Sequence, residues 1–288
     1  MTRTLNRLLT LSILSLALAV SSVSVLGAGK VLYVTHEPGQ WHKYTPQLKV
    51  FKEQIAKKAG WDITIMTGDY DSLIEQLKKR NFAKGYDAIV YNYCLAKSTD
   101  LDAAANVMRQ TRNGGVPAML IHCSMHSWWD TYKTGEKGAL GEGYKGKALA
   151  TPEIAKKWKA ENGDKRFPAY GDFTGVASVR HGKKLPITLH KVGDHPATKD
   201  LKEGYKTPNT ELYNNEYVLK RVVPIIMGSQ EGEKDAIVMW TCPQGKSQVM
   251  GLSLGHGAVG DGPDEWETPE FQNLVINGVN YLIDNPKP

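Results

Sequence analysis

Four histidines of the sequence follow short apolar runs that have the character of β-strands, or lie close behind one. They are His36, His122, His126 and His256. If those runs form neighbouring parallel strands, the imidazoles at their carboxyl ends converge on one edge of the sheet. A pocket with several imidazoles can transfer protons near neutral pH or bind a divalent metal ion. Because a single histidine is more often a hydrogen-bonded structural residue, the prediction depends on their shared position.

A fifth histidine, His42, lies in the loop 37–44, between the first expected strand and the first expected helix. That loop leaves the same edge of the sheet, so His42 can reach the pocket from one side. A solvated loop residue is an equally good interpretation.

The elements that must position these histidines alternate between strand and helix in the first half of the chain. Apolar runs predict strands at 30–35, 61–66, 87–93 and 116–121, and amphipathic patterns predict helices at 46–59, 71–80 and 100–112. Such alternation predicts an α/β fold with a doubly wound, mainly parallel sheet and helices on both faces. The second half is richer in strands, with runs at 187–192, 217–227, 236–242 and 248–254 before a closing helix at 268–283.

After the fourth strand the chain becomes rich in lysine and glycine, and residues 131–166 read as an insertion. Long loops in compact domains are often functional lids, and the aromatic content here favours an ordered one. Trp128 and Trp129 stand at its start. We therefore expect one α/β domain over 29–288, with a lid over the strand ends.

The N-terminus predicts export. Arg3 and Arg7 precede an apolar stretch at 8–20, followed by small residues up to Ala28, which is the pattern of a secretory signal peptide over 1–28. The stretch is too short to span a bilayer comfortably. We expect a periplasmic or secreted protein with no membrane contact after signal cleavage.

Charge and motifs argue against nucleic acid and nucleotide ligands. The formal net charge is +6, two units of which leave with the signal peptide, and no dense basic run is present. Residues 255–260 match a GxGxxG pattern, but they follow a late strand rather than opening the first strand-to-helix turn. No nucleotide cofactor is expected.

Three cysteines, Cys94, Cys123 and Cys242, are an odd number for an exported chain. Cys94 and Cys123 each end a strand-like run, so they form a bridge if those strands are neighbours, and otherwise remain buried thiols. Cys123 follows a strand, as a nucleophile does. However, Ile121 and Met125 stand where a tight nucleophile turn has glycines.

Taken together, several segments resemble the ThuA-like (trehalose-utilisation) family, which is similar in fold to class I glutamine amidotransferases. The resemblance is carried by His36 and by residues 114–122, 195–198, 210–213, 245–246, 251–256 and 277–278. It implies a flavodoxin-like core without the Cys-His-Glu triad of glutaminases, and a link to bacterial disaccharide and keto-sugar catabolism. The matching polar positions are His36, His122, Glu211 and His256. The segment 131–166 is expanded relative to the family pattern.

The leading hypothesis is a carbohydrate-active enzyme, a hydrolase, lyase or isomerase that acts on a sugar or keto-sugar glycoside. His122 or His36 would abstract a proton, and His256 or Glu211 would protonate the leaving or carbonyl oxygen. The expected substrate-binding residues are His42, His126, Trp128 and Trp129.

Two alternatives stay open at this point. A metal-dependent hydrolase would hold zinc or manganese on His36, His122 and His256, with Glu211 as a fourth ligand or as the base. A non-catalytic sugar-binding or assembly protein would use the same pocket without turnover. In each case the expected partner is a small carbohydrate, and a homo-oligomer is compatible with the sequence.

Overall fold

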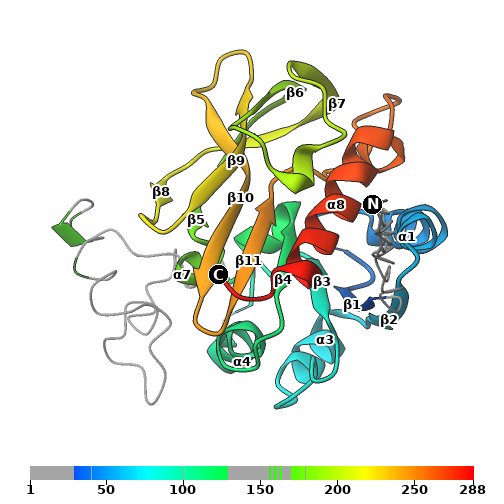
Figure 1. Cartoon of the computed structure of the whole chain (residues 1–288), viewed down its shortest axis with the longest axis vertical. Helices are drawn as coiled ribbons and strands as arrows, with labels where there is room; N and C mark the ends of the chain where they lie inside the picture. The colour runs from blue at the N-terminus through cyan, green and yellow to red at the C-terminus, as the bar shows by residue number, and fades with distance from the viewer. Residues whose placement is uncertain are drawn as a thin grey trace, which may run out of the picture.

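The computed structural model describes residues 29–39, 41–98, 100–128, 156, 159–160, 163, 170–178 and 180–288. The expected signal peptide, Trp129 and nearly all of the expected lid at 131–166 lie outside the described residues. Within them, one nine-stranded sheet organises the chain in the order β2-β1-β3-β4-β11-β10-β9-β6-β7 (Figure 1).

The first five strands of that order run parallel to one another. They are β2 (Asp62–Met66), β1 (Lys30–Thr35), β3 (Ala88–Asn92), β4 (Ala118–Ile121) and β11 (Ser247–Leu252). Every residue of β3, β4 and β11 is buried. Their apolar sequences fit a parallel sheet, which is covered on both faces.

The other four strands form an antiparallel extension. They are β10 (Ala236–Gln244), β9 (Val223–Ser229), β6 (His181–Lys191) and β7 (Tyr205–Tyr213). The expected α/β architecture is therefore present, but the sheet is mixed rather than mainly parallel. A separate two-stranded ribbon pairs β5 (Val176–Ala177) with β8 (Tyr217–Val218).

Helices cover both faces of the parallel part, as expected. The continuous helical segment α1 (Tyr44–Val50), η1 (Phe51–Ala56) and α2 (Lys57–Ala59) packs on one face with α8 (Pro269–Asp284). On the other face lie α3 (Tyr70–Leu77) and α4 (Leu101–Arg112). Alternate residues of β1 enter the two cores, since Val31 and Tyr33 face the first, whereas Leu32 and Val34 face the second.

Side-chain caps define where the main helices begin. Asp69, Asp100 and Thr268 each accept a hydrogen bond from the backbone N–H three residues later. Thr268 is followed by Pro269, which stands at the first helical position as the sequence indicates. Short helical turns also occur at α7 (Gly171–Thr174), η2 (His122–His126), η4 (Pro196–Thr198) and η5 (Glu265–Glu267).

The sequence interpretation differs from the structure in two strands. It expects no strand at β7, whose sequence YKTPNTELY is polar and contains Pro208. It also expects one strand over 217–227, where the structure has β8, a turn, and then β9. The proline in β7 is tolerated because β7 is the edge strand of the sheet.

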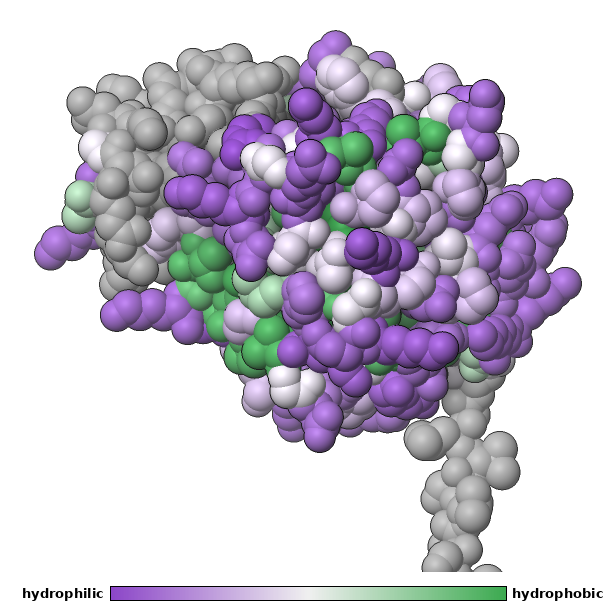
Figure 2. All heavy atoms as spheres, turned by 90° about the horizontal axis from the view of Figure 1, so that it is seen from above, coloured by the Kyte–Doolittle hydropathy of each residue, from purple (hydrophilic) through white to green (hydrophobic). Residues whose placement is uncertain are grey.

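The described surface seen from above is mostly hydrophilic, with hydrophobic side chains in small separate groups (Figure 2). No helix among the described residues has the length and apolar character needed to cross a membrane.

Candidate functional site

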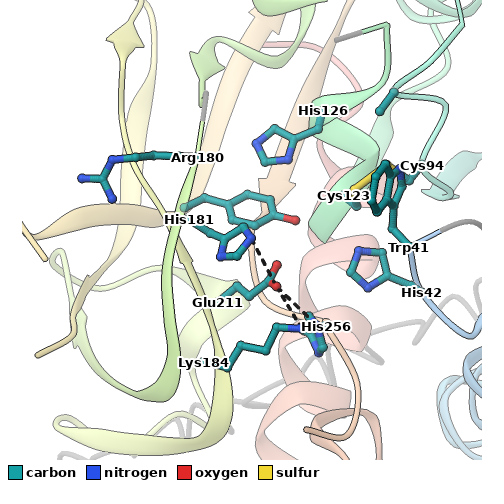
Figure 3. Close-up of a pocket in the computed structure, with 12 residues that line it drawn as sticks. Trp41, His42, Cys94, Cys123, His126, Arg180, His181, Lys184, Glu211 and His256 are labelled. Carbon is teal, nitrogen blue, oxygen red and sulfur yellow. Dashed lines mark ion pairs between the residues drawn. A yellow bond between two sulfur atoms is a disulfide. The ribbon is translucent and has the colours of Figure 1, made fainter. Parts of the chain in front are cut away.

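A cavity of about 530 Å³ opens where the carboxyl ends of the parallel strands meet the antiparallel extension (Figure 3). Its volume lies in the range of small-molecule sites. One wall comes from loops that follow β1, β3, β4 and β11, and the other from β6 and β7. The lining residues are Trp41, His42, Cys94, Ala96, Cys123, His126, Arg180, His181, Lys184, Glu211, Tyr213 and His256.

His122 directly follows β4 and has a backbone φ of 48°, a left-handed conformation that is uncommon for a residue with a side chain. Such strain tends to occur at functional sites. The imidazole is 2% exposed and lies behind the pocket wall. Its Nδ1 is 2.7 Å from the carbonyl oxygen of Ser253, which can only accept, so Nδ1 carries a proton. In the neutral imidazole the Nε2 lone pair therefore accepts from the hydroxyl of Tyr213 at 3.0 Å.

Glu211 is the centre of the polar wall, because four side-chain nitrogens surround its carboxylate. Lys184 Nζ, His256 Nε2 and His181 Nε2 lie 3.4, 3.4 and 3.5 Å from Oε1, and His122 Nε2 lies 3.4 Å from Oε2. Figure 3 shows three of these pairs converging on the carboxylate. All four distances are longer than an ordinary hydrogen bond.

The carboxylate of Glu211 remains ionised in this setting. Burial raises its pKa, but the neighbouring imidazoles of His122, His181 and His256 outweigh burial and leave the pKa well below its usual value. Glu211 thus presents a charged acceptor to the cavity.

Three imidazoles meet beside this carboxylate. The ring centroid of His42 lies 4.8 Å from that of His122 and 5.1 Å from that of His256. The ring centroids of His122 and His256 lie 5.5 Å apart. Burial, with smaller contributions from neighbouring imidazoles, lowers the pKa of His42 to about 2 and that of His256 to about 4. Both side chains are therefore neutral at neutral pH.

His126 also lines the cavity, where its ring stacks on Tyr213 at a centroid distance of 4.2 Å. Burial lowers its pKa to about 3. His42, His126 and His256 are thus brought together at the pocket, in agreement with the predicted convergence of imidazoles on one edge.

His36 lies apart from this group. Its Nε2 accepts a hydrogen bond from the Cys94 N–H at 3.4 Å, and its ring packs on Tyr44 at 5.0 Å. The side chain is 1% exposed and burial lowers its pKa to about 4. His36 follows β1 as expected, but the chain turns so that His42, six residues later, occupies the place beside His122 and His256.

The metal-binding arrangement expected of His36, His122 and His256 is not found. Across the described ranges, no three histidine, cysteine, aspartate or glutamate side chains form a group that could hold a metal ion.

Trp128 belongs to the core rather than to the pocket. It is completely buried, packs on Tyr170 at 4.9 Å, and donates its indole N–H to the carbonyl oxygen of Asp100. Trp41 instead lines the cavity, with 55% of its surface exposed. An exposed tryptophan beside a polar wall is a feature of ligand sites.

The cysteine pair that the sequence leaves open is a disulfide. Cys94 and Cys123 are bonded, with their Cα atoms 5.2 Å apart, because β3 and β4 are neighbours. The bridge lines the cavity together with Trp41 and His42, while Cys242 is a buried free thiol.

Several lining residues escape the sequence analysis. Lys184 lies directly opposite Glu211 in the β6–β7 pairing, so recognising Lys184 requires β7. Tyr213 belongs to the same unrecognised strand, and His181 lies at the start of β6. Trp41 does carry a signal, since it is adjacent to His42 in a loop expected at the pocket.

Comparison with known proteins identifies the architecture. No protein-family model and no sequence of a characterised protein matches the chain. Among solved structures, a ThuA-like protein from Parabacteroides merdae matches with a TM-score of 0.58 and 15% identity, over 90% of this chain and 91% of that one. A ThuA-like protein from Bacteroides uniformis matches with a TM-score of 0.58 and 14% identity, over 89% and 92%.

Two β-galactosidases share the fold in part. The enzyme from Rahnella sp. R3 matches with a TM-score of 0.51 and 8% identity, over 91% of this chain and 33% of that one. The enzyme from Bacillus circulans matches with a TM-score of 0.50 and 9% identity, over 87% and 30%. The ThuA-like matches, in contrast, extend over nearly the whole of both chains, and they show that this chain has the fold of the ThuA-like proteins.

Proposed function

We propose that the chain is an enzyme that acts on a sugar or keto-sugar glycoside by proton transfer, as a hydrolase, lyase or isomerase. The observation that carries this proposal is the carboxylate of Glu211. It is ionised, faces the cavity, and has its four neighbouring nitrogens at 3.4 to 3.5 Å, beyond hydrogen-bond length. A buried carboxylate in this state gains from ligand groups that donate hydrogen bonds.

Sugar hydroxyls are donors of that kind. A pyranose also has a face of C–H groups, which suits the exposed ring of Trp41 on the opposite wall. A ligand held between the two would place its hydroxyls on Glu211 and Lys184 and its apolar face on Trp41. The cavity thus has one wall for each surface of a sugar.

The acid–base group of this proposal is the pair Tyr213 and His122. Tyr213 lines the cavity, and its hydroxyl donates to the Nε2 lone pair of His122. A proton from the ligand can move to the Tyr213 oxygen as Tyr213 passes its own proton to His122, and the reverse transfer returns one. The two transfers occur together because burial raises the pKa of Tyr213 well above its ordinary value. His122 therefore acts through Tyr213, because its own ring lies behind the wall.

The comparisons support a carbohydrate context without assigning a reaction. The two β-galactosidases described above share the fold, and this chain matches about a third of their length. Galactosidase activity is a property of those complete enzymes. Here we propose only that the ligand is a small carbohydrate.

We also propose that the protein is exported to the periplasm or secreted. The N-terminal signal pattern supports this, and so does the disulfide between Cys94 and Cys123, since such bonds persist in oxidising compartments.

A binding and turnover experiment tests the function. Trehalose, maltose, cellobiose and lactose, with their 3-keto derivatives, are titrated into the protein by calorimetry and recovered for mass spectrometry. We expect at least one to bind and to be converted, and Glu211→Gln to weaken its binding about tenfold to a hundredfold. Glu203→Gln, on an exposed side chain outside the cavity, is the matched control.

The outcomes separate the alternatives. Binding with intact recovery would replace the enzyme by a non-catalytic sugar-binding protein. No binding by any of the sugars would overturn the carbohydrate assignment, and equal binding by Glu211→Gln would overturn the role of the carboxylate.

A further inference from the structure

The turn that carries His256 is held by one buried carboxylate. Glu265, in η5, is 1% exposed, and its Oε2 accepts hydrogen bonds from the backbone N–H groups of Gly255 and His256 at 2.8 and 3.1 Å. The same oxygen accepts from the hydroxyl of Thr210 at 3.0 Å. One oxygen atom thus joins two segments that are distant in sequence.

The second segment is the strand that carries Glu211. Thr210 precedes Glu211 in β7, and the side chains of Glu211 and His256 approach to 3.4 Å in the pocket. Glu265 therefore connects the turn that carries His256 to the residue that precedes Glu211 in β7. It does not itself line the cavity.

The turn has little conformational preference of its own. Gly255 and Gly257 flank His256 with φ values of 109° and 99°, which residues with side chains rarely adopt. Because glycine is freely rotating, such a segment is ordered by what it contacts rather than by its sequence. Contacts outside the turn must therefore supply the order.

Those contacts are hydrogen bonds to both the N–H and the carbonyl groups of the turn. Glu265 binds its N–H groups, while Gln47 Nε2 donates to the carbonyl oxygens of Gly255 and His256, each at 3.3 Å. The indole N–H of Trp266, next to Glu265, donates to the carbonyl oxygen of Gly255 at 2.9 Å. Glu265 also reaches β7, through the hydrogen bond that it accepts from Thr210.

We propose that Glu265 is a positioning residue that fixes the imidazole of His256 opposite Glu211 and keeps it out of solvent. This goes beyond the proposed function, because it concerns how the site is assembled and holds whichever ligand the site binds. Burial raises the pKa of Glu265 even though Gly255 and His256 donate to it. A glutamine at this position, with the same shape and a neutral acceptor, is therefore a close substitute.

The test is an NMR titration of the His256 imidazole in the full chain without ligand, with its signals assigned by His256→Asn. In the native protein, burial lowers the pKa of His256 to about 4. In Glu265→Ala we expect the pKa to rise by at least about one unit toward the ordinary value, because a released turn exposes the ring. Glu265→Gln should keep the low pKa.

A control and a second variant keep the test decisive. Glu267→Ala, at an exposed position of the same short helix, should leave the titration of His256 unchanged. If Glu265→Ala does not fold, Glu265→Asp replaces it, since the shorter side chain withdraws the carboxylate from the turn. An unchanged His256 pKa in the folded variant, or an equal rise in Glu267→Ala, would overturn the proposal. Neither result depends on whether the pocket binds a sugar.

Discussion

The hydroxyl of Tyr213 lies 3.0 Å from Nε2 of His122, with the two rings 4.7 Å apart at an angle of 31°. Tyr213 comes from the last strand of the antiparallel extension, and His122 from the turn after a central parallel strand. The pair therefore joins the two parts of the sheet at the site proposed for proton transfer.

Replacing Tyr213 by phenylalanine tests this pair. The ring would still stack on His126, but His122 would lose its hydrogen-bond donor. We expect kcat on the accepted glycoside to fall about 10²-fold or more with little change in KM. Tyr205→Phe, on the same strand but outside the cavity, is the control. A rise in KM with an unchanged kcat would show that Tyr213 only binds the ligand.

Replacing Trp41 by alanine tests the apolar wall of the pocket. Because Trp41 is 55% exposed, its loss should leave stability nearly unchanged and weaken sugar binding by about tenfold. Val223→Ala, at a residue of the same exposure outside the cavity, provides the matched comparison by calorimetry. Unaltered affinity in Trp41→Ala would show that the ring of Trp41 does not stack on the sugar.

The buried imidazoles make stability depend on pH in a defined direction. Burial lowers the pKa of His42, His126 and His256 to about 2, 3 and 4, whereas the unfolded chain protonates them near 6.5. The unfolded state therefore binds more protons below pH 6.5. The contribution of these imidazoles to the free energy of unfolding should be fully present above pH 6.5 and be lost progressively as the pH falls toward about 2.

The magnitude is up to about 1.4 kcal/mol per pH unit for each imidazole. Urea denaturation at a series of pH values measures it, and the low pKa of Glu211 adds a loss in the same direction below its ordinary pKa. His256→Asn should reduce the slope by up to about a quarter between pH 6 and 5, because burial also lowers the pKa of His36, His42 and His126. A slope equal to that of the native chain would show that His256 is not buried in its neutral form.

The disulfide should contribute substantially to stability. Cys94 and Cys123 are separated by 29 positions, and closing a loop of that length stabilises a fold by about 3 to 4 kcal/mol in the chain-entropy description. Reductant should lower the free energy of unfolding of the native chain by that amount, measured by urea denaturation. The double variant Cys94→Ala and Cys123→Ala should have a low free energy of unfolding from the outset, and reductant should not change it. A response in that variant would point to another effect of the reductant.

The parallel strands and their helices are predictable because their residues have one strong pattern each. Runs such as 88–92 and 118–121 are buried on both faces, which the sequence shows as continuous apolar residues. β7 has no such pattern, since its exposed edge position permits polar residues and Pro208. Glu211 could therefore be named only through family resemblance, and its partner Lys184 not at all.

Whether the position of a site residue could be predicted from the sequence depends on its local surroundings. His122 directly follows β4, so its placement is determined by the sheet, whereas His256 lies four residues after the end of β11, in a turn held by Glu265 and Gln47. His36 also follows a strand, but its side chain packs beneath Tyr44 and the pocket position goes to His42. Trp128 has a φ of 60°, and that reversal of the backbone accompanies a side chain in the core, which no sequence pattern reveals.

The position of β11 has a consequence for how the protein acquires its site. This strand is the last of the chain, yet it lies between β4 and β10 and joins the parallel part of the sheet to the extension. Until it is inserted, the wall with Glu211 and Tyr213 has no sheet hydrogen bonds to the wall with the disulfide. Such late, non-local pairing slows folding. The pocket therefore cannot be complete until β11 pairs with both β4 and β10.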